Sequence, residues 1–275
     1  MSRARVETPC GVPRPSHLDK LDAARDERDL EISGSHLIRI LDETGSTNAD
    51  LLALGCDARE GDWLVARRQT AGRGRAGRQW EDGAGNFMGS TVVALRPGDP
   101  PAQTLALVAG LAVAQAVASV PGAPAAKLKW PNDLLVAGAK LAGILLERAG
   151  DNVIVGVGVN LLRAPEVPGR KTTALADHGA AAEPGDFAEL LRDNFAETLL
   201  RWRDGQWDAL RGEWLARAHP PGTPLSVNDR DGHPIVGTFA GLGADGAALL
   251  RLADGSVRPI HAGDVELVRT HAARA

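Results

Sequence analysis

The chain has 275 residues and a net charge of −4, with 44% hydrophobic and 24% charged residues. This composition is ordinary for a globular protein. It excludes a generally basic nucleic-acid binder, which usually carries positive charge over a whole face. The length fits one large domain, or one of middling size together with a smaller one.

The sequence carries no sign of a metal centre, an export signal or a membrane span. Cys10 and Cys56 are the only cysteines, and neither they nor the seven scattered histidines have metal-binding spacing. We therefore predict that the protein has no built-in metal site and that it is located in the reducing cytoplasm. The N-terminus is polar and lacks the apolar core of a signal peptide. The longest apolar run, residues 104–120, contains Gln115 and is bounded by prolines, which predicts a buried helix and no membrane contact.

The N-terminal part is predicted to form a tail, a strand and a helix. Residues 1–34 are polar and contain prolines, which predicts a loose tail leading into a short helix. Residues 37–41 resemble a strand, and Ser46 or Thr47 then caps a helix that has apolar residues Leu51, Leu52 and Leu54. At this stage capping alone explains Ser46, Thr47 and Asn48.

A loop rich in glycine and arginine follows the second predicted strand, residues 62–67. Residues 72–78 hold three glycines and three arginines, and Trp80 stands just beyond them. Glycine lets the backbone pass close to a ligand, and guanidinium groups offer planar sets of donors suited to phosphate or carboxylate. The loop therefore predicts an anionic ligand, most simply a nucleotide. A solvated turn or an RNA contact are the alternatives.

Further strands and a helix follow in the middle of the chain. Residues 86–95 are prone to form a strand, and residues 102–120 form the buried helix. Pro131-Asn132-Asp133 marks a turn, and residues 134–136 and 141–147 form a hairpin about Gly138.

Lys140 lies at the edge of this hairpin, and residues 153–159 form the next strand, which ends at Asn160. That strand contains Gly156 and Gly158, and glycine inside a strand indicates that a ligand or another backbone comes close. By default Lys140 is a solubilising residue, Asn132 and Asp133 are turn formers, and Asn160 caps a strand.

The C-terminal part is predicted to hold two helices and a small β domain. Apolar residues recur at helical spacing over residues 187–202 and again over 207–215. Pro220-Pro221-Gly222 is the best domain boundary in the chain. Five short β segments lie beyond it, with turns at 228–229, 244–246, 254–255 and 262–264, which suggests a small barrel.

The chemistry suggested by these residues is an adenylation. The sequence contains no P-loop, no Gly-x-Ser-x-Gly elbow and no kinase motifs, and nothing marks an activated protein nucleophile. A substrate carboxylate that attacks the α-phosphorus of ATP needs only alignment and charge stabilisation from the protein. The arginine loop, Lys140 and the polar residues Ser46, Thr47 and Gln69 are candidates for those tasks.

Five motifs stand in a specific order along the chain. They are Gly45-Ser46-Thr47-Asn48, Gln69-Thr70-Ala71-Gly72-Arg73-Gly74-Arg75-Ala76-Gly77-Arg78-Gln79-Trp80, Lys129-Trp130-Pro131-Asn132-Asp133, Lys140-Leu141-Ala142-Gly143-Ile144-Leu145 and Gly156-Val157-Gly158-Val159-Asn160. Together they resemble the biotin protein ligases, by motif over residues 37–165 and by architecture over the C-terminal segment. The resemblance implies an α/β (α+β) fold with a mixed-sheet catalytic domain at 35–219 and a C-terminal SH3-like β-barrel at 222–270, preceded by the tail at 1–34.

The resemblance also implies the reaction. Biotin and MgATP would form biotinyl-5′-AMP and pyrophosphate, and the biotinyl group would then move to a lysine of a biotin carboxyl carrier domain of a carboxylase. ATP and Mg²⁺ would be required, with no tightly bound prosthetic group and with Mg²⁺ brought by ATP, near Asp133. We expect a cytoplasmic monomer or weak homodimer that contacts neither DNA nor membrane.

Site residues follow from the same resemblance, position by position. Lys140 and Arg75 would be the catalytic residues. The biotin site would be formed by Ser46, Thr47, Asn48, Gln69, Arg73, Gly74, Arg75, Lys140, Gly143 and Gly156. The ATP or adenylate site would be formed by Arg73, Arg75, Arg78, Trp80, Asn132, Asp133, Lys140 and Asn160.

The chain departs from some family members in one respect, and two rival functions stay open. About 36 residues precede the first predicted strand, too few for the winged helix-turn-helix of members that repress transcription, so we expect no repressor function. A lipoate protein ligase is the nearest rival, because its fold and chemistry are similar. A nucleic-acid-binding module that uses the basic loop is the rival from another class.

Overall fold

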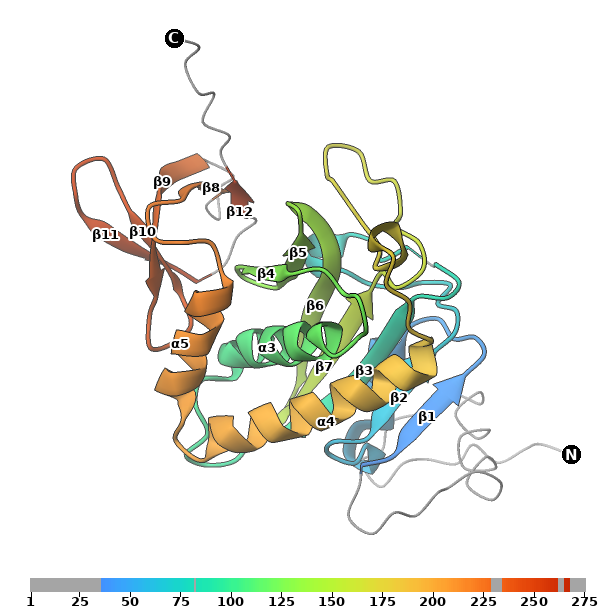
Figure 1. Ribbon diagram of the computed structural model, residues 1–275. Coiled ribbons are helices and arrows are strands. Elements are labelled where there is room, and N and C mark those ends of the chain that lie inside the picture. Colours follow the sequence, from blue (N-terminus) through green and yellow to red (C-terminus); the bar gives the residue numbers. More distant parts are fainter. Residues whose placement is uncertain (1–35, 82, 229–233, 262–264, 268–275) are drawn as a thin grey trace, which may run out of the picture.

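The computed structural model describes residues 36–81, 83–228, 234–261 and 265–267 (Figure 1). These residues form a larger unit with a mixed sheet and a smaller unit with an antiparallel sheet. The predicted N-terminal tail and its short helix lie outside the described residues. The expected mixed α/β class is confirmed.

The larger sheet has seven strands in the order β1-β2-β3-β7-β6-β5-β4. Strands β1 and β2 pair in parallel, whereas every other pair of neighbouring strands in this sheet is antiparallel, so the sheet is mixed. The strands are β1 (Ile38–Leu41), β2 (Trp63–Ala66), β3 (Phe87–Ala94), β4 (Ala126–Lys129), β5 (Asp133–Val136), β6 (Ala139–Ala149) and β7 (Asn152–Val159).

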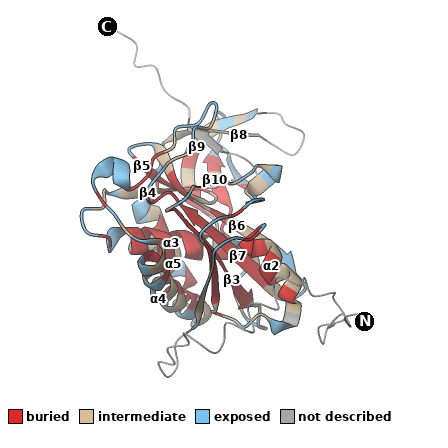
Figure 2. Ribbon diagram, turned by 90° about the vertical axis from the view of Figure 1, so that its right-hand side faces the viewer, coloured by how far each residue is buried: buried red, intermediate tan, exposed pale blue. Residues whose placement is uncertain are grey.

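Helices cover both faces of this sheet. The helices are α2 (Thr47–Leu54), α3 (Leu105–Ala118), α4 (Pro184–Arg203) and α5 (Trp207–Arg217). Figure 2 shows α3, α4 and α5 on one side of the central strands and α2 on the other. Because α3 is apolar almost all round and most of it is buried, the predicted core helix is confirmed.

Alternation along β7 separates the core from the opposite face. Its valines at 153, 155, 157 and 159 belong to the main hydrophobic cluster together with residues of α3 and α4. Successive side chains of a strand point to opposite faces, so Ile154, Gly156 and Gly158 share the other face. Ile154 packs with Leu51 and Leu54 of α2. The two glycines beyond it make room on that face for the side chains of Asn48, in α2, and Trp80.

The smaller sheet has five antiparallel strands in the order β11-β10-β9-β8-β12. Its strands are β8 (Pro224–Asn228), β9 (Pro234–Leu242), β10 (Ala248–Arg251), β11 (Val257–Ile260) and β12 (Val265–Leu267). The five short strands were predicted, and so were the turns at 244–246 and 254–255. The expected turns at 228–229 and 262–264 lie partly or wholly outside the described residues. No pairing within the described ranges joins β11 to β12, so a closed barrel is not confirmed.

Two boundaries differ from the sequence prediction. The segment around Lys127 was not predicted as a strand but forms β4, because it pairs with β5 in antiparallel register. Strand β6 begins at Ala139, so Lys140 lies inside a strand and is bound on its other side by the segment near Thr172. Non-local pairing therefore decided both boundaries.

Two indole groups attach the smaller sheet to the larger unit. Trp130 Nε1 donates to the carbonyl of Gly246 at 3.0 Å, and Trp207 Nε1 donates to that of Ala244 at 2.5 Å. Both carbonyls belong to the turn between β9 and β10. Buried indole N–H groups normally need such partners, so the turn is held at defined points.

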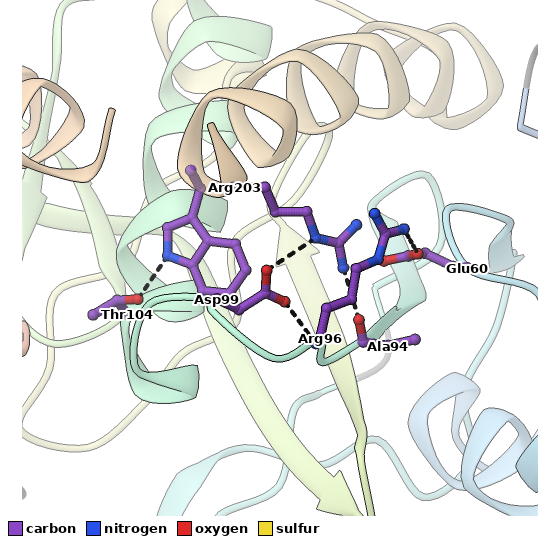
Figure 3. Close-up of polar contacts among 7 residues, drawn as sticks. Glu60, Ala94, Arg96, Asp99, Thr104 and Arg203 are labelled. Carbon is purple, nitrogen blue, oxygen red and sulfur yellow. Dashed lines mark hydrogen bonds and ion pairs between the residues drawn. The ribbon is translucent and has the colours of Figure 1, made fainter. Parts of the chain in front are cut away.

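A cluster of charged side chains, here called the Arg203 cluster, ties the end of α4 to the segments before β2 and after β3 of the larger sheet (Figure 3). It consists of Glu60, Arg96, Asp99 and Arg203. Arg203 Nη2 lies 2.5 Å from Glu60 Oε1 and 2.7 Å from the Ala94 carbonyl oxygen. Arg96 Nη2 lies 2.7 Å from Glu60 Oε2, and the Arg96 N–H donates to Asp99 Oδ2 at 2.9 Å. Two carboxylates and two guanidinium groups thus balance one another.

None of the helices in the described ranges combines the length and the apolar character needed to cross a membrane.

Candidate active site

A cavity of about 320 Å³ opens on the face of the larger sheet that carries the β7 glycines. Its wall comes from the start of α2, the glycine–arginine loop, β3, β5, β6, β7 and the segment after β7. Every site residue predicted from the sequence lines it: Ser46, Thr47, Asn48, Gln69, Arg73, Gly74, Arg75, Arg78, Trp80, Asn132, Asp133, Lys140, Gly143, Gly156 and Asn160. The structure thus brings residues from five distant stretches to one place.

One end of the cavity is built from the start of α2. Ser46 is the N-cap and accepts from the Ala49 N–H at 3.5 Å, as the capping interpretation predicted. Gln69 lies opposite, because the segment around Thr44 runs parallel to it. Its Oε1 accepts from the backbone N–H of Thr47 at 2.8 Å. The capping residues are therefore also pocket residues.

The glycine–arginine loop folds back on itself. The Gly74 N–H donates to the Arg78 carbonyl at 2.7 Å, and the Trp80 N–H donates to the Gly72 carbonyl at 3.0 Å. A Cβ at Gly72 would lie 2.6 Å from the Trp80 carbonyl oxygen, so glycine is required for this approach. The backbone at Ala76 is left-handed, with φ of 55°. The loop thereby turns its arginines toward the cavity.

The loop arginines reach the sheet at two points. Arg75 Nη1 donates to Asn132 Oδ1 at 3.0 Å, which connects the loop to the start of β5. Arg73 Nη1 lies 3.4 Å from Glu147 Oε1 on β6. Asn132 is itself oriented, because its Nδ2 donates to the Ile144 carbonyl at 2.7 Å.

Lys140 lines the cavity from β6 and is fixed along its backbone. Its N–H donates to the Lys171 carbonyl at 2.8 Å, and its carbonyl accepts from the Thr173 N–H at 2.9 Å. The ammonium lies 2.5 Å from Asp133 Oδ1 and 5.8 Å from the centre of the Trp80 ring. A positive charge is therefore held at the cavity by an acid and an aromatic face.

Trp80 lies flat against the two strands because glycines make room for it. A Cβ at Gly158 would lie 2.3 Å from a ring atom of Trp80, and one at Gly143 would lie 3.2 Å from another. Gly143 and Gly158 are register partners on β6 and β7. The sequence predicted that a ligand or another backbone approaches the β7 glycines, but the approaching groups are side chains, Trp80 at Gly158 and Asn48 at Gly156.

Asn160 is buried at the end of β7 and binds protein groups. Its Nδ2 donates to the Thr173 carbonyl at 3.1 Å, and its N–H donates to the Leu141 carbonyl at 2.9 Å. It therefore fixes the segment after β7, from which Arg170 and Thr172 also line the cavity.

Sequence reasoning missed Ser90 and Glu147. Ser90 Oγ donates to Asn48 Oδ1 at 2.6 Å, and Asn48 Nδ2 donates to Glu147 Oε2 at 2.7 Å. Both residues lie within predicted strands, where polar residues are expected on the exposed face. Only the register of β3, β7 and β6 brings them to Asn48, so no local signal identified them.

The charges that line the cavity are unequal. Its cationic side chains are Arg73, Arg75, Arg78, Lys140 and Arg170, and its carboxylates are Glu81 and Asp133. A cavity with five cations and two acids attracts an anion. Within the described residues no group of three or more His, Cys, Asp or Glu side chains is placed to hold a metal ion.

Comparisons with known families agree with this geometry. Residues 44–160 match the biotin/lipoate A/B protein ligase family, and residues 226–268 match the biotin protein ligase C-terminal domain. The chain is 39% identical over 227 residues to a biotin--[acetyl-CoA-carboxylase] ligase of Paracoccus denitrificans, covering 77% of this chain and 93% of the relative. The corresponding ligase of Mycobacterium tuberculosis is 37% identical over 267 residues, which cover 91% of this chain and 98% of the relative.

A bifunctional ligase/repressor of Bacillus subtilis is 32% identical, over 86% of this chain and 75% of the relative. Among solved structures, a biotin protein ligase of Aquifex aeolicus in complex with biotin and ATP superimposes with a TM-score of 0.74 and 27% identity. The superposition covers 85% of this chain and 99% of the Aquifex chain.

Proposed function

The chain belongs to the biotin/lipoate A/B protein ligase family, and we propose that it attaches biotin to a carrier protein in two steps at the cavity. One observation carries the proposal. A single cavity combines an excess of positive charge with a row of small polar groups at one end. Biotin has a polar head and a carboxylate tail, and ATP carries a triphosphate. The two substrates bound side by side would match these two parts of the cavity.

The first step is adenylation. A carboxylate oxygen of biotin forms a bond to the α-phosphorus of ATP, the bond from that phosphorus to the bridging oxygen breaks, and pyrophosphate leaves. Negative charge grows on the phosphate oxygens, and cations held in place stabilise it without reorganisation. Lys140 and Arg75 perform this task, and charge-assisted hydrogen bonds contribute about 1.5–3 kcal/mol each.

The second step is acyl transfer. The amine of the carrier lysine, after losing a proton, forms a bond to the acyl carbon of biotinyl-AMP, and AMP leaves as the acyl–oxygen bond breaks. The protein adds no covalent intermediate of its own, in agreement with the lack of an activated nucleophile. The glycine–arginine loop excludes water between the steps, because an acyl phosphate hydrolyses easily.

We assign the polar end of the cavity to biotin. Ser46, Thr47, Asn48 and Gln69 hold its ring, and Gly143 and Gly156, which also line the cavity, belong to the same site. Arg73, Gly74 and Arg75 wrap the region where the biotin carboxylate meets phosphate. The hydrogen bonds of Thr47 and Gln69 support this assignment, since they orient both side chains before ligand arrives.

We assign the opposite end to the nucleotide. Arg78, Trp80, Asn132 and Asn160 contact ATP or the adenylate, with Trp80 near the adenine. Mg²⁺ enters with ATP, and Asp133 is a carboxylate of the cavity able to share it. Mg²⁺ is typically held by one or two carboxylates together with substrate phosphates, so this single carboxylate fits the ion. When bound, the ion neutralises charge on the phosphates.

Calorimetry followed by mass spectrometry tests the function. Biotin and lipoate are titrated separately, each with and without ATP, and a purified biotin carboxyl carrier domain is then added. We expect binding of biotin, release of pyrophosphate, and a mass increase of one biotinyl group on the carrier. A carrier whose acceptor lysine is replaced by arginine is the control. Binding of lipoate and none of biotin would make the protein a lipoate ligase.

The organisation of the chain is part of the same proposal. Residues 35–219 act as the catalytic domain and residues 222–270 as an SH3-like domain that docks through its β9–β10 turn. The protein acts in the cytoplasm as a monomer or weak homodimer. Sedimentation analysis with and without biotinyl-AMP tests the assembly state.

A further inference from the structure

Glu147 is a carboxylate that makes two contacts at the edge of the cavity. Its Oε2 accepts from Asn48 Nδ2 at 2.7 Å, and its Oε1 lies 3.4 Å from Arg73 Nη1. Its side chain is 24% exposed, and the contact with Asn48 is part-buried, whereas the contact with Arg73 is exposed. Glu147 therefore joins two segments far apart in sequence, the start of α2 and the glycine–arginine loop.

The sheet register places Glu147 where it can do this. Ser90 on β3, Gly156 on β7 and Leu145 on β6 form one row across three strands. Asn48 lies over this row, and a Cβ at Gly156 would lie 2.2 Å from Asn48 Oδ1. Glu147 is two residues beyond Leu145 and so shares its face of β6. The Asn48 amide thus spans from Ser90 to Glu147.

The carboxylate decides which way this amide points. An ionised carboxylate only accepts hydrogen bonds, so it requires the NH₂ group of Asn48 on its side. The amide oxygen of Asn48 must then face Ser90, whose hydroxyl donates to it at 2.6 Å. The single proton of Ser90 is thereby used.

The orientation of the Asn48 amide also determines the direction of the hydrogen bond between Ser90 and Thr47. Thr47 Oγ1 lies 2.6 Å from Ser90 Oγ and 3.2 Å from Gln69 Oε1. Because the Ser90 proton is committed to Asn48, the Thr47 hydroxyl is the donor in both contacts, and the shorter one is to Ser90. The oxygen of Thr47 is then left as an acceptor. Next to it, Gln69 Oε1 accepts from the Thr47 N–H at 2.8 Å, so the Gln69 amide presents its donor side to its other neighbours.

We propose that Glu147 is a positioning residue that sets the donor and acceptor pattern of the Asn48–Ser90–Thr47 row and holds Arg73 at the same time. The proposal rests on the function proposed above. A cyclic urea, the head of biotin, has two N–H donors beside one carbonyl, and it is recognised by an ordered alternation of acceptors and donors. A dithiolane ring has neither group. The fixed polarity therefore selects a ureido head over a lipoyl head.

The direct test is Glu147→Gln, which keeps the size of the side chain and removes its charge. A glutamine offers one oxygen and one NH₂ group where Asn48 and Arg73 both need acceptors. We expect the Kd for biotin to rise about 10-fold or more, the effect of losing a charge-assisted hydrogen bond, with a smaller rise in the Kd for ATP alone, because Arg73 also loses its partner. Glu189→Gln, an exposed change on α4, is the matched control.

A double variant that exchanges the carboxylate and the amide distinguishes a change in hydrogen-bond direction from a simple loss of folding. Asn48→Asp places a carboxylate against Glu147, so we expect it to weaken biotin binding by itself. Combined with Glu147→Gln, the new amide can donate to the new carboxylate, and Ser90 can still donate to Asp. The double variant should regain most of the biotin affinity, with thermal unfolding recorded for every variant.

Four results separate the outcomes. Recovery in the double variant supports the proposal. A Glu147→Gln variant that binds biotin as wild type does, or a double variant as weak as the product of the two single changes, overturns it. Absence of biotin binding by the unaltered chain would instead refute the proposed function itself.

Discussion

The cavity and the Arg203 cluster are built from the same kinds of charged side chain but differ in how their charges are balanced. In the Arg203 cluster two guanidinium groups meet Glu60 and Asp99, and the carbonyl of Ala94 accepts from Arg203 as well. Around the cavity five cationic side chains face two carboxylates. Charges balanced by protein groups hold segments together, whereas an excess of one sign around a cavity is suited to a ligand of the other sign.

The Arg203 cluster and the cavity also differ in position. Arg203 and Asp99 are largely buried, with side chains 13% and 9% exposed. They join the end of α4 to the loop after β3, and neither lines the cavity. Stability and activity should therefore respond separately to mutations in the two regions.

Among the variants considered, Lys140→Ala should show the largest difference between its effect on activity and its effect on stability. Removing the ammonium leaves the developing phosphate charge without one fixed donor, a loss on the order of 10²–10³-fold in rate. Exchange of pyrophosphate into ATP in the presence of biotin measures adenylation, and urea unfolding measures stability. We expect the rate to fall by this factor with the fold retained.

Lys127→Ala is the control for this change, because Lys127 is exposed on β4 and does not line the cavity. Its exchange rate should match that of wild type. Normal turnover by the Lys140 variant would remove Lys140 from the catalytic residues.

Arg203→Ala should show the reverse behaviour. It removes one partner from each of two part-buried carboxylates, because Glu60 keeps Arg96 and Asp99 keeps the Arg96 backbone N–H, so we expect a loss of about 1.5–3 kcal/mol of unfolding free energy. Urea unfolding should reveal this loss, while the pyrophosphate exchange rate of the folded protein stays unchanged. Arg211→Ala removes a pair with Asp208, which is 81% exposed, and should cost less than about 1 kcal/mol. Equal losses in the two variants would contradict the structural role of the cluster.

Much of the fold could be predicted because it rests on local patterns. Helices α3, α4 and α5 have apolar residues at helical spacing, and the central strands are β-branched and bounded by turns. Strand β4 was missed because Lys127-Leu128-Lys129 is short and polar, and only its partner β5 makes it a strand.

The site was predictable to the extent that its residues stand in contiguous motifs. Ser90 and Glu147 escaped because their importance depends on the register of three strands, which no local pattern encodes. Arg203 escaped for the same reason, since Glu60 lies 143 residues away along the chain. At the end of a helix, Arg203 by itself is an ordinary basic residue that complements the helix dipole.

Arg75→Gly tests whether the excess charge of the cavity retains the intermediate. The guanidinium links the loop to Asn132, so its loss should loosen the loop, and adenylation, though slower without this charge, should still proceed through Lys140. We expect biotinyl-AMP to dissociate about 10-fold faster, corresponding to one lost charged hydrogen bond. A filter assay of labelled adenylate measures this rate. Retention equal to that of wild type would mean that the loop does not act as a lid.

The smallest expected effect is a pH dependence of the Arg203 cluster. Burial alone raises the pKa of Glu60, but hydrogen bonds from Arg203 and Arg96 lower it more, so the pKa lies below its ordinary value of 4.5. A depressed folded-state pKa stabilises the protein above 4.5, and this contribution is lost as the pH falls through the folded-state value.

Glu60→Gln should therefore cost about 1–2 kcal/mol of unfolding free energy at pH 7. The difference from wild type should shrink as the pH falls below 4.5, because protonation removes the same charge from the wild-type side chain. Urea unfolding of both proteins between about pH 3 and pH 7 measures this convergence. The exposed change Glu189→Gln should show no such convergence. If the Glu60 difference stayed constant with pH, the cluster would stabilise the fold through packing, and charge balance would no longer distinguish it from the cavity.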